Sequence, residues 1–99
     1  MILEIATIKI KPGMDREFEA AVTKAAPIFS TARGCTSMKL RRCLENSETY
    51  LLFVEWVTLE NHTVDFRESE KFQEWRKLIG DCLDGTPEAV HYNVAVEGF

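Results

Sequence analysis

The stretch from Tyr50 to Trp56 is the most apolar part of the chain and has the pattern of a β-strand. Successive side chains of a strand point to opposite faces of its sheet. One face would carry Tyr50, Leu52, Val54 and Trp56, and the other would carry Leu51 and Phe53 before Glu55. Both faces are apolar, so both need a cover. Two helices of this chain can cover one face, and a second copy of the chain is the simplest cover for the other.

Three further stretches have strand character, namely Ile2–Lys11, Cys35–Cys43 and Val90–Val96. On the first of them Glu4 shares a face with apolar residues, which are Ile2, Ala6, Ile8 and Ile10. On the last, alternation would place His91 and Tyr92 on opposite faces.

Two stretches have apolar residues at helical spacing, from Met14 to about Ala32 and from Glu70 to about Leu83. Their apolar stripes are Met14, Phe18, Val22, Ala25 and Phe29 in the first, and Phe72, Trp75, Ile79 and Leu83 in the second. Pro27 lies inside the first helix and is expected to kink or split it.

Thr58 and Ser69 are expected to be helix N-caps. Between them we expect one or two helical turns with Leu59, Thr63 and Phe66 facing inward. The resulting order, β-α-β-β-α-β, predicts an α+β fold of the ferredoxin-like type for the single domain 1–99. Its four-stranded antiparallel sheet would carry both helices on one face.

The formal net charge of −4 argues against nucleic acid or an anionic membrane as the main partner. The one tight basic cluster, Lys39, Arg41 and Arg42, fits a solvated strand edge. The sequence shows no signal-peptide pattern and no apolar run of membrane-spanning length, so we expect a cytoplasmic protein. Three cysteines without C-x-x-C spacing are expected to be free thiols, namely Cys35, Cys43 and Cys82.

Several short segments together resemble the antibiotic biosynthesis monooxygenase (ABM) family. They are Glu55–Trp56, Leu59–Thr63, Phe66–Ser69, Gln73–Arg76 and Val90–Tyr92, with the Lys11–Gly13 turn as further support. The resemblance implies a dimeric α/β barrel, in which two sheets face each other across a homodimer. Some members of that family oxidise phenolic polyketides or quinols with O2 and no cofactor, and others degrade haem.

The resemblance also implies a catalytic site. The polyketide-oxidising relatives use a Trp, a Tyr and an Arg, and here Trp56 and Arg76 match while His62 stands at the tyrosine position. Our hypothesis is that Trp56 stacks on a planar ring, His62 accepts a proton and Arg76 stabilises the developing anion. Leu52 replaces the usual Asn on the third strand. The expected substrate-binding residues are Leu52, Phe66, Phe72, His91 and Tyr92.

Structural roles are the alternatives at each position. Trp56 would then be packing, His62 would bind backbone in a helical turn, and Arg76 would favour the negative end of its helix. No metal or cofactor is expected, because no G-x-G-x-x-G, P-loop or Cys/His cluster is present.

Three other functions are alternatives to the aromatic monooxygenase. A non-catalytic dimeric barrel that binds a small hydrophobic ligand stays open. Haem degradation is disfavoured, because Ala6, Phe66 and Arg76 replace the Asn, Trp and His that the haem-degrading relatives use. RNA recognition is disfavoured, because Thr49 and Tyr50 stand where its third-strand motif has a basic residue and glycine.

Overall fold

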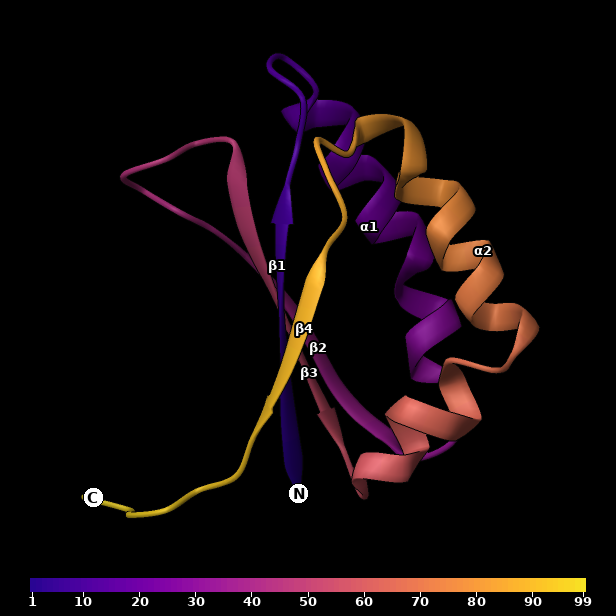
Figure 1. The fold of residues 1–99 in the computed structure, drawn as a ribbon, viewed down its shortest axis with the longest axis vertical. Helices are drawn as coiled ribbons and strands as arrows, with labels where there is room; N and C mark the ends of the chain where they lie inside the picture. Colours follow the sequence, from indigo (N-terminus) through magenta and orange to yellow (C-terminus); the bar gives the residue numbers. More distant parts are fainter.

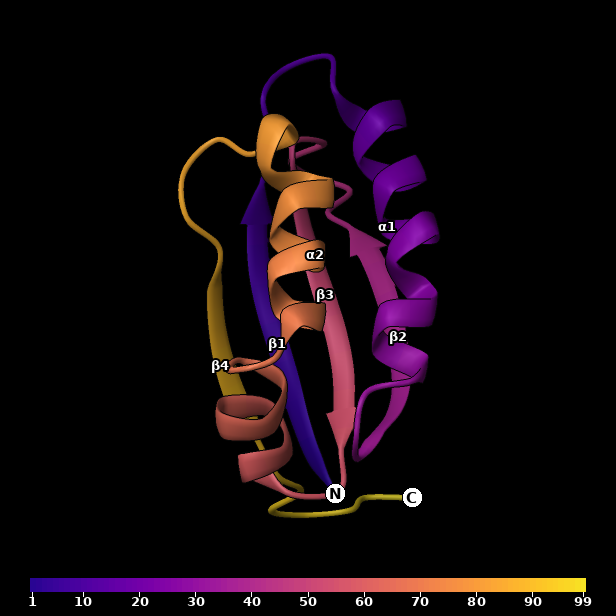
Figure 2. The ribbon, with the colours of Figure 1, turned by 90° about the vertical axis from the view of Figure 1, so that its right-hand side faces the viewer.

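The computed structural model describes the whole chain, residues 1–99. Its strands pair antiparallel in the order β2-β3-β1-β4, and both α-helices lie on one side of the sheet (Figure 1 and Figure 2). The elements are β1 (Ile2–Lys9), α1 (Asp15–Ser30), β2 (Cys35–Arg42), β3 (Thr49–Trp56), the π-helix η1 (Asn61–Phe66), α2 (Glu70–Ile79), the 3-10 turn η2 (Gly80–Cys82) and β4 (Glu88–Tyr92). The predicted ferredoxin-like fold is confirmed.

The central strand β3 anchors the hydrophobic core. Its four inward side chains are at most 1% exposed, and they are Tyr50, Leu52, Val54 and Trp56, as predicted. Burial of each large apolar side chain contributes roughly 1.5–3 kcal/mol. β1 covers one edge of β3 and β2 covers the other, so β3 is the strand around which both layers are packed.

The opposite face of the sheet is also apolar at its centre. The strand register places Phe53 beside Ile5 and Ile5 beside Val90. Val90 is half-exposed, and so is Tyr92, which pairs with Leu3. No element of the chain covers this face, which lies away from the helices (Figure 1).

Helix α1 buries four of the five residues of its predicted stripe, Phe18, Val22, Ala25 and Phe29, while Met14 lies just before the helix and is partly buried. Of the two expectations for Pro27, a kink or a split, the split does not occur, because the helix continues to Ser30. The proline ring is exposed, and only the last turn follows it. The Pro27 carbonyl still accepts hydrogen bonds from the backbone and the hydroxyl of Thr31, at 3.2 and 2.6 Å.

Helix α2 ends at Ile79, before the predicted Leu83. Gly80 has a low helix propensity, and the chain tightens there into the turn η2. Leu83 then pairs with Ile10 beyond the end of β1, so it is extended and does not continue the helical stripe. The predicted cap is confirmed, because the Ser69 hydroxyl accepts the backbone N–H of Phe72 at 3.4 Å.

The last strand spans Glu88–Tyr92, whereas the sequence predicted Val90–Val96. Tyr92 pairs with Leu3, which is the second residue of the antiparallel strand β1. Almost no residue of β1 is therefore left to pair with the segment that follows Tyr92. Val94 and Val96 are accordingly 75% and 86% exposed. Within β4, Ala89 and His91 are partly buried while their neighbours are exposed, in agreement with the predicted alternation.

The segment between β3 and α2 begins with the predicted cap. The Thr58 hydroxyl accepts the backbone N–H of Asn61, and the Asn61 side chain accepts the N–H of Thr58, at 3.2 and 3.0 Å. The buried residues are His62 and Phe66, so the prediction is confirmed for Phe66 and wrong for Leu59, which is exposed, while Thr63 is partly buried. The wider winding of a π-helix explains the change, and the N–H of Arg67 donates to the carbonyl of His62 at 3.1 Å.

All three cysteines are free, as predicted. None of the helices combines the length and the apolar character needed to cross a bilayer.

Gly34 offers a test of how this segment is held. Gly34 and Gly13 both have positive φ, at 79° and 81°. A Cβ on Gly34 would collide with the side chain of Asn61, whereas a Cβ on Gly13 would meet nothing within 4 Å. Gly13→Ala should therefore cost only the backbone strain, about 1–2 kcal/mol. Gly34→Ala should cost roughly 2–5 kcal/mol, because overpacking is added.

Urea unfolding of both variants measures the difference. Equal losses for the two variants would show that Asn61 moves freely and does not tie η1 to the start of β2.

Candidate functional site

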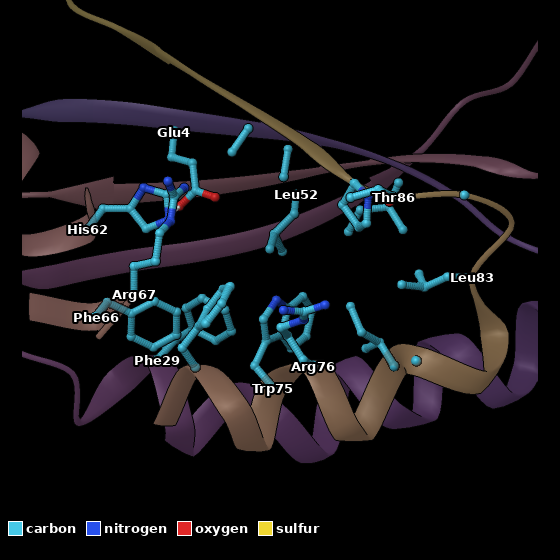
Figure 3. A pocket seen from close by; sticks show the side chains of 18 residues that line it. Glu4, Phe29, Leu52, His62, Phe66, Arg67, Trp75, Arg76, Leu83 and Thr86 are labelled. Carbon is cyan, nitrogen blue, oxygen red and sulfur yellow. Dashed lines mark ion pairs between the residues drawn. The ribbon is translucent and has the colours of Figure 1, made fainter. Parts of the chain in front are cut away.

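A cavity of about 630 Å³ lies between the sheet and the helices (Figure 3). That volume is in the range of small-molecule sites. Its middle is lined by apolar side chains of both layers, including Leu52 from the sheet and Phe29, Phe66 and Trp75 from the helical layer. The far end is closed by the segment Leu83–Ala89, which includes Gly85, Thr86 and Pro87.

Two ionisable side chains lie at the end of this cavity opposite the segment Leu83–Ala89, and both are buried. Glu4 and His62 are 5% and 3% exposed, and every other buried residue is hydrophobic. The His62 Nε2 lies 3.4 Å from the Glu4 Oε1. Ionisable side chains are seldom buried without a polar partner, and here each of the two lies beside the other.

Trp56 and His91 extend the pair in two directions. The Trp56 indole N–H donates to the same Glu4 oxygen at 3.0 Å, and its ring stacks on His62 with centroids 5.2 Å apart. On the other side, the His62 Nδ1 lies 2.7 Å from the His91 Nε2, so one nitrogen donates and the other accepts. The strands β3, β1 and β4 thus supply Trp56, Glu4 and His91, and η1 places His62 over them.

Burial sets the protonation of this cluster. It raises the pKa of Glu4 to about 7, against the lowering influence of the Trp56 hydrogen bond and of the Arg67 charge. Burial, then His91 and Arg67, lower the pKa of His62 to about 4. The pKa of His91 is lowered by burial and by Arg67. Near neutral pH both imidazoles are therefore neutral, and Glu4 is close to its titration midpoint.

Two arginines line the helical side of the cavity, Arg67 just after η1 and Arg76 on α2. Neither forms an ion pair, since the ion pairs that arginine or lysine forms in this chain are those of Arg42 with Asp15 and Glu19. The Arg76 guanidinium lies 5.8 Å from the centre of the Phe72 ring. Both cations are thus free to meet a negative group in the cavity.

The fold and the sequence both match those of known proteins. The family model for antibiotic biosynthesis monooxygenases (ABM) matches residues 1–78. The chain belongs to this family.

Individual relatives agree with this assignment. The Bacillus subtilis protein YczJ, whose function is uncharacterised, is 42% identical over 92 residues, which are 93% of this chain and 97% of YczJ. A Bordetella bronchiseptica crystal structure, proposed to be an antibiotic biosynthesis monooxygenase, is 46% identical with a TM-score of 0.94, over 96% of this chain and 97% of that one. SnoaB from Streptomyces nogalater, a cofactor-independent oxygenase, has a TM-score of 0.78 over 98% and 95% of the two chains. Its 13% identity shows a common fold alone.

The structure brings together five of the residues that the ABM resemblance indicated. The cavity is lined by Leu52, His62, Phe66, Phe72 and Arg76. Three others lie outside its lining. Trp56 is fully enclosed and His91 sits behind His62, while Tyr92 pairs beside Leu3 and is half-exposed.

Sequence reasoning missed Glu4 and Arg67 as site residues. Glu4 had a visible signal, because it is the one charged residue on the apolar face of its strand. Arg67 had no such signal, because an arginine in a polar connecting segment is normally a solvent-exposed surface residue.

The buried pair predicts opposing pH effects on stability. Between pH 4.5 and 7 the folded chain holds a proton on Glu4 that the unfolded chain has released, so this group makes stability fall as pH rises. Between pH 4 and 6.5 the unfolded chain holds a proton on His62 that the folded chain lacks, so stability rises with pH. The contributions of Glu4 and His62 should therefore nearly cancel where these windows overlap, and His91, whose pKa is also lowered, adds a shallow rise with pH.

Glu4→Gln should expose the histidine contribution, with stability rising by roughly 3 kcal/mol from pH 4 to 6.5, at 1.36 kcal/mol per pKa unit. His62→Gln should show the reverse slope from Glu4. Urea unfolding at half-unit steps of pH gives both slopes. Parallel profiles for the two variants would contradict a neutral His62 beside a Glu4 that titrates near pH 7.

Proposed function

We propose that this ABM protein is a cofactor-independent monooxygenase that oxidises an aromatic, phenolic or quinol-like small molecule with O2. One observation carries the proposal. An apolar cavity has a buried carboxyl–imidazole pair at one end and two unpaired guanidinium groups along its helical side. Those parts suit a substrate that must become an electron-rich anion before it reacts with oxygen.

The chemistry needs no external reductant. The substrate supplies two electrons and two hydrogens, one oxygen atom enters the product, and the other leaves as water. A phenolate or hydroquinone anion gives up an electron to O2 far more readily than the neutral molecule. The protein's part is therefore to take the hydroxyl proton and to hold the resulting oxyanion.

The residues divide this work by position. Arg76 and Arg67 can stabilise the oxyanion from the helical side, and Phe66 and Phe72 offer ring faces to a planar substrate. Trp56 is 0% exposed and holds Glu4 and His62 in place. We therefore assign Trp56 a positioning role and give the stacking role to the cavity phenylalanines.

Oxygen uptake with hydroquinones, naphthols and anthrones tests the proposal on dialysed, metal-free protein. Uptake that yields one water per oxidised substrate supports it. Saturable binding of these compounds without any uptake would favour the rival function, a non-catalytic protein that binds a small hydrophobic ligand.

Arg76→Ala should lower kcat on the best substrate by about 10²–10³, the usual loss when one oxyanion partner is removed. Arg16→Ala is the matched control, because Arg16 is exposed on α1 and lies outside the cavity. A kcat for Arg76→Ala equal to that of the control would remove Arg76 from the mechanism.

We also propose that the protein works as a homodimer whose subunits meet through the uncovered sheet face. That face has Ile5, Phe53 and Val90 at neighbouring register positions, and an exposed apolar patch of this kind marks an interaction site. A second copy would also give a chain of 11.3 kDa more buried surface than it can build alone.

Sedimentation should find a particle of twice the chain mass. Phe53→Asp should shift it toward the monomer, since a charge would be buried in the interface. Leu44→Asp should not, because Leu44 is 94% exposed in the hairpin between β2 and β3. A stable wild-type monomer would refute the dimer.

The proposed setting is the cytoplasm, where reducing conditions keep thiols free. The three unpaired cysteines support this location. The acidic net charge, −4, favours small-molecule partners over nucleic acid.

A further inference from the structure

We propose that Glu4 takes the proton from the substrate hydroxyl and that His62 and His91 carry it from the cavity to the outer edge of the sheet. This inference rests on the proposed oxygenase function. It changes the role of His62 from proton acceptor to proton carrier, and it adds two residues, Glu4 and His91, to the mechanism.

The Glu4 carboxyl can reach a substrate in the cavity. Its Oε1 accepts the Trp56 N–H and lies 3.4 Å from the His62 Nε2, whereas its Oε2 makes no hydrogen bond. No buried side-chain oxygen or nitrogen of the chain lacks a partner, so this Oε2 is accessible from the space around it. Glu4 lines the cavity, and its carboxyl lies beside His62 at the end opposite Leu83 and Thr86 (Figure 3).

His62 lies between Glu4 and His91. Its Nε2 faces Glu4 at 3.4 Å and its Nδ1 faces His91 at 2.7 Å. An imidazole placed between two such groups can accept a proton at one nitrogen while it releases another from the opposite nitrogen.

His91 connects the buried pair to the solvent. It lies on β4, which is an edge strand of the sheet, and it is partly exposed, whereas Glu4 and His62 are buried. Glu4 and His91 are direct register partners on β1 and β4. The three groups therefore form a continuous path from the cavity to the solvent at the sheet edge.

The transfer balances without any redox partner. The O–H bond of the substrate breaks as an O–H bond forms on the Glu4 carboxylate. After the carboxyl turns, its proton passes to the His62 Nε2 while the His62 Nδ1 proton passes to the His91 Nε2. His91 then releases a proton from its Nδ1 to water, and the substrate is left as the anion that reacts with O2.

The surroundings favour this direction. Burial gives Glu4 a pKa of about 7, so its carboxylate is a stronger base than an exposed one. The groups that face Glu4 are Trp56 on β3, His91 on β4, His62 and Arg67 at η1, and the Cys35 thiol, whose pKa is raised by burial and by the Glu4 charge. Arg67 is the one permanent charge among them, and its cation opposes a lasting positive charge on either imidazole.

Nitrogen-15 NMR of histidine-labelled protein tests the path without a substrate. The chain has only two histidines, so both rings can be assigned directly. We expect both rings to be neutral at pH 7, with a coupling across the hydrogen bond between the His62 Nδ1 and the His91 Nε2. A missing coupling, or a ring that carries both protons at pH 7, would overturn the path.

Steady-state turnover tests the proton transfer itself, once a compound that the protein oxidises has been found. Glu4→Gln should lose about 100-fold in kcat, within the range for general-base removal. His91→Ala and His91→Gln should each lose about tenfold or more in dilute buffer, and added imidazole should restore the rate by taking over the exit step. Arg76→Ala is the contrast, because imidazole should not restore it.

The outcomes separate the two proposals. Full activity of both His91 variants in dilute buffer, or a loss that imidazole does not restore, would overturn the relay and leave the oxygenase standing. An intact histidine coupling with no oxygen uptake from any substrate would support the hydrogen-bonded path and overturn the oxygenase.

Discussion

The arrangement of this protein depends on one buried carboxyl group. Glu4 sits among the core residues of β1, where an apolar side chain would be easier to accommodate. An unpaired carboxylate there would cost several kcal/mol. Trp56 donates a hydrogen bond to it, His62 places a ring nitrogen 3.4 Å away, and His91 completes the network. Each of these contacts comes from a different element, so satisfying Glu4 aligns β3, β4 and η1 against β1.

The π-helix is what makes this alignment possible. Its wider winding turns His62 and Phe66 inward together, and its start is held by the reciprocal Thr58–Asn61 cap. Asn61 in turn fills the space above Gly34, which has no side chain. π-Helical turns often occur at functional sites. Here the turn delivers an imidazole to the cavity, and Arg67 follows directly behind it.

Much of the fold could be predicted from hydrophobic spacing. The alternation in Tyr50–Trp56 and the helical stripe of α1 were both predicted correctly, because each reflects a single local period. The end of β4 was not predicted correctly. Val94 and Val96 have the residue type and spacing of a strand, but β1 is too short to offer them pairing partners. Leu83 was missed for a similar reason, since its pairing with Ile10 is a long-range contact.

The site was predicted less completely than the fold. Family resemblance led to His62, Phe66 and Arg76, which line the cavity. It did not lead to Glu4, because the partners of a buried carboxyl lie on β3 and η1, far away in sequence. The placement of Trp56 also needed three dimensions, since a strand-end tryptophan can face a ligand or support its neighbours, and here it supports Glu4 and His62.

The protonation of Glu4 is the quantity on which both the buried network and the proposed chemistry depend most. Infrared difference spectra between the wild type and Glu4→Gln isolate the carbonyl stretch of that one carboxylic acid. We predict a protonated-acid band at pH 6 that fades as the pH passes about 7. A carboxylate that stays ionised down to pH 5 would contradict this picture, because Glu4 would then be an ordinary solvated acid.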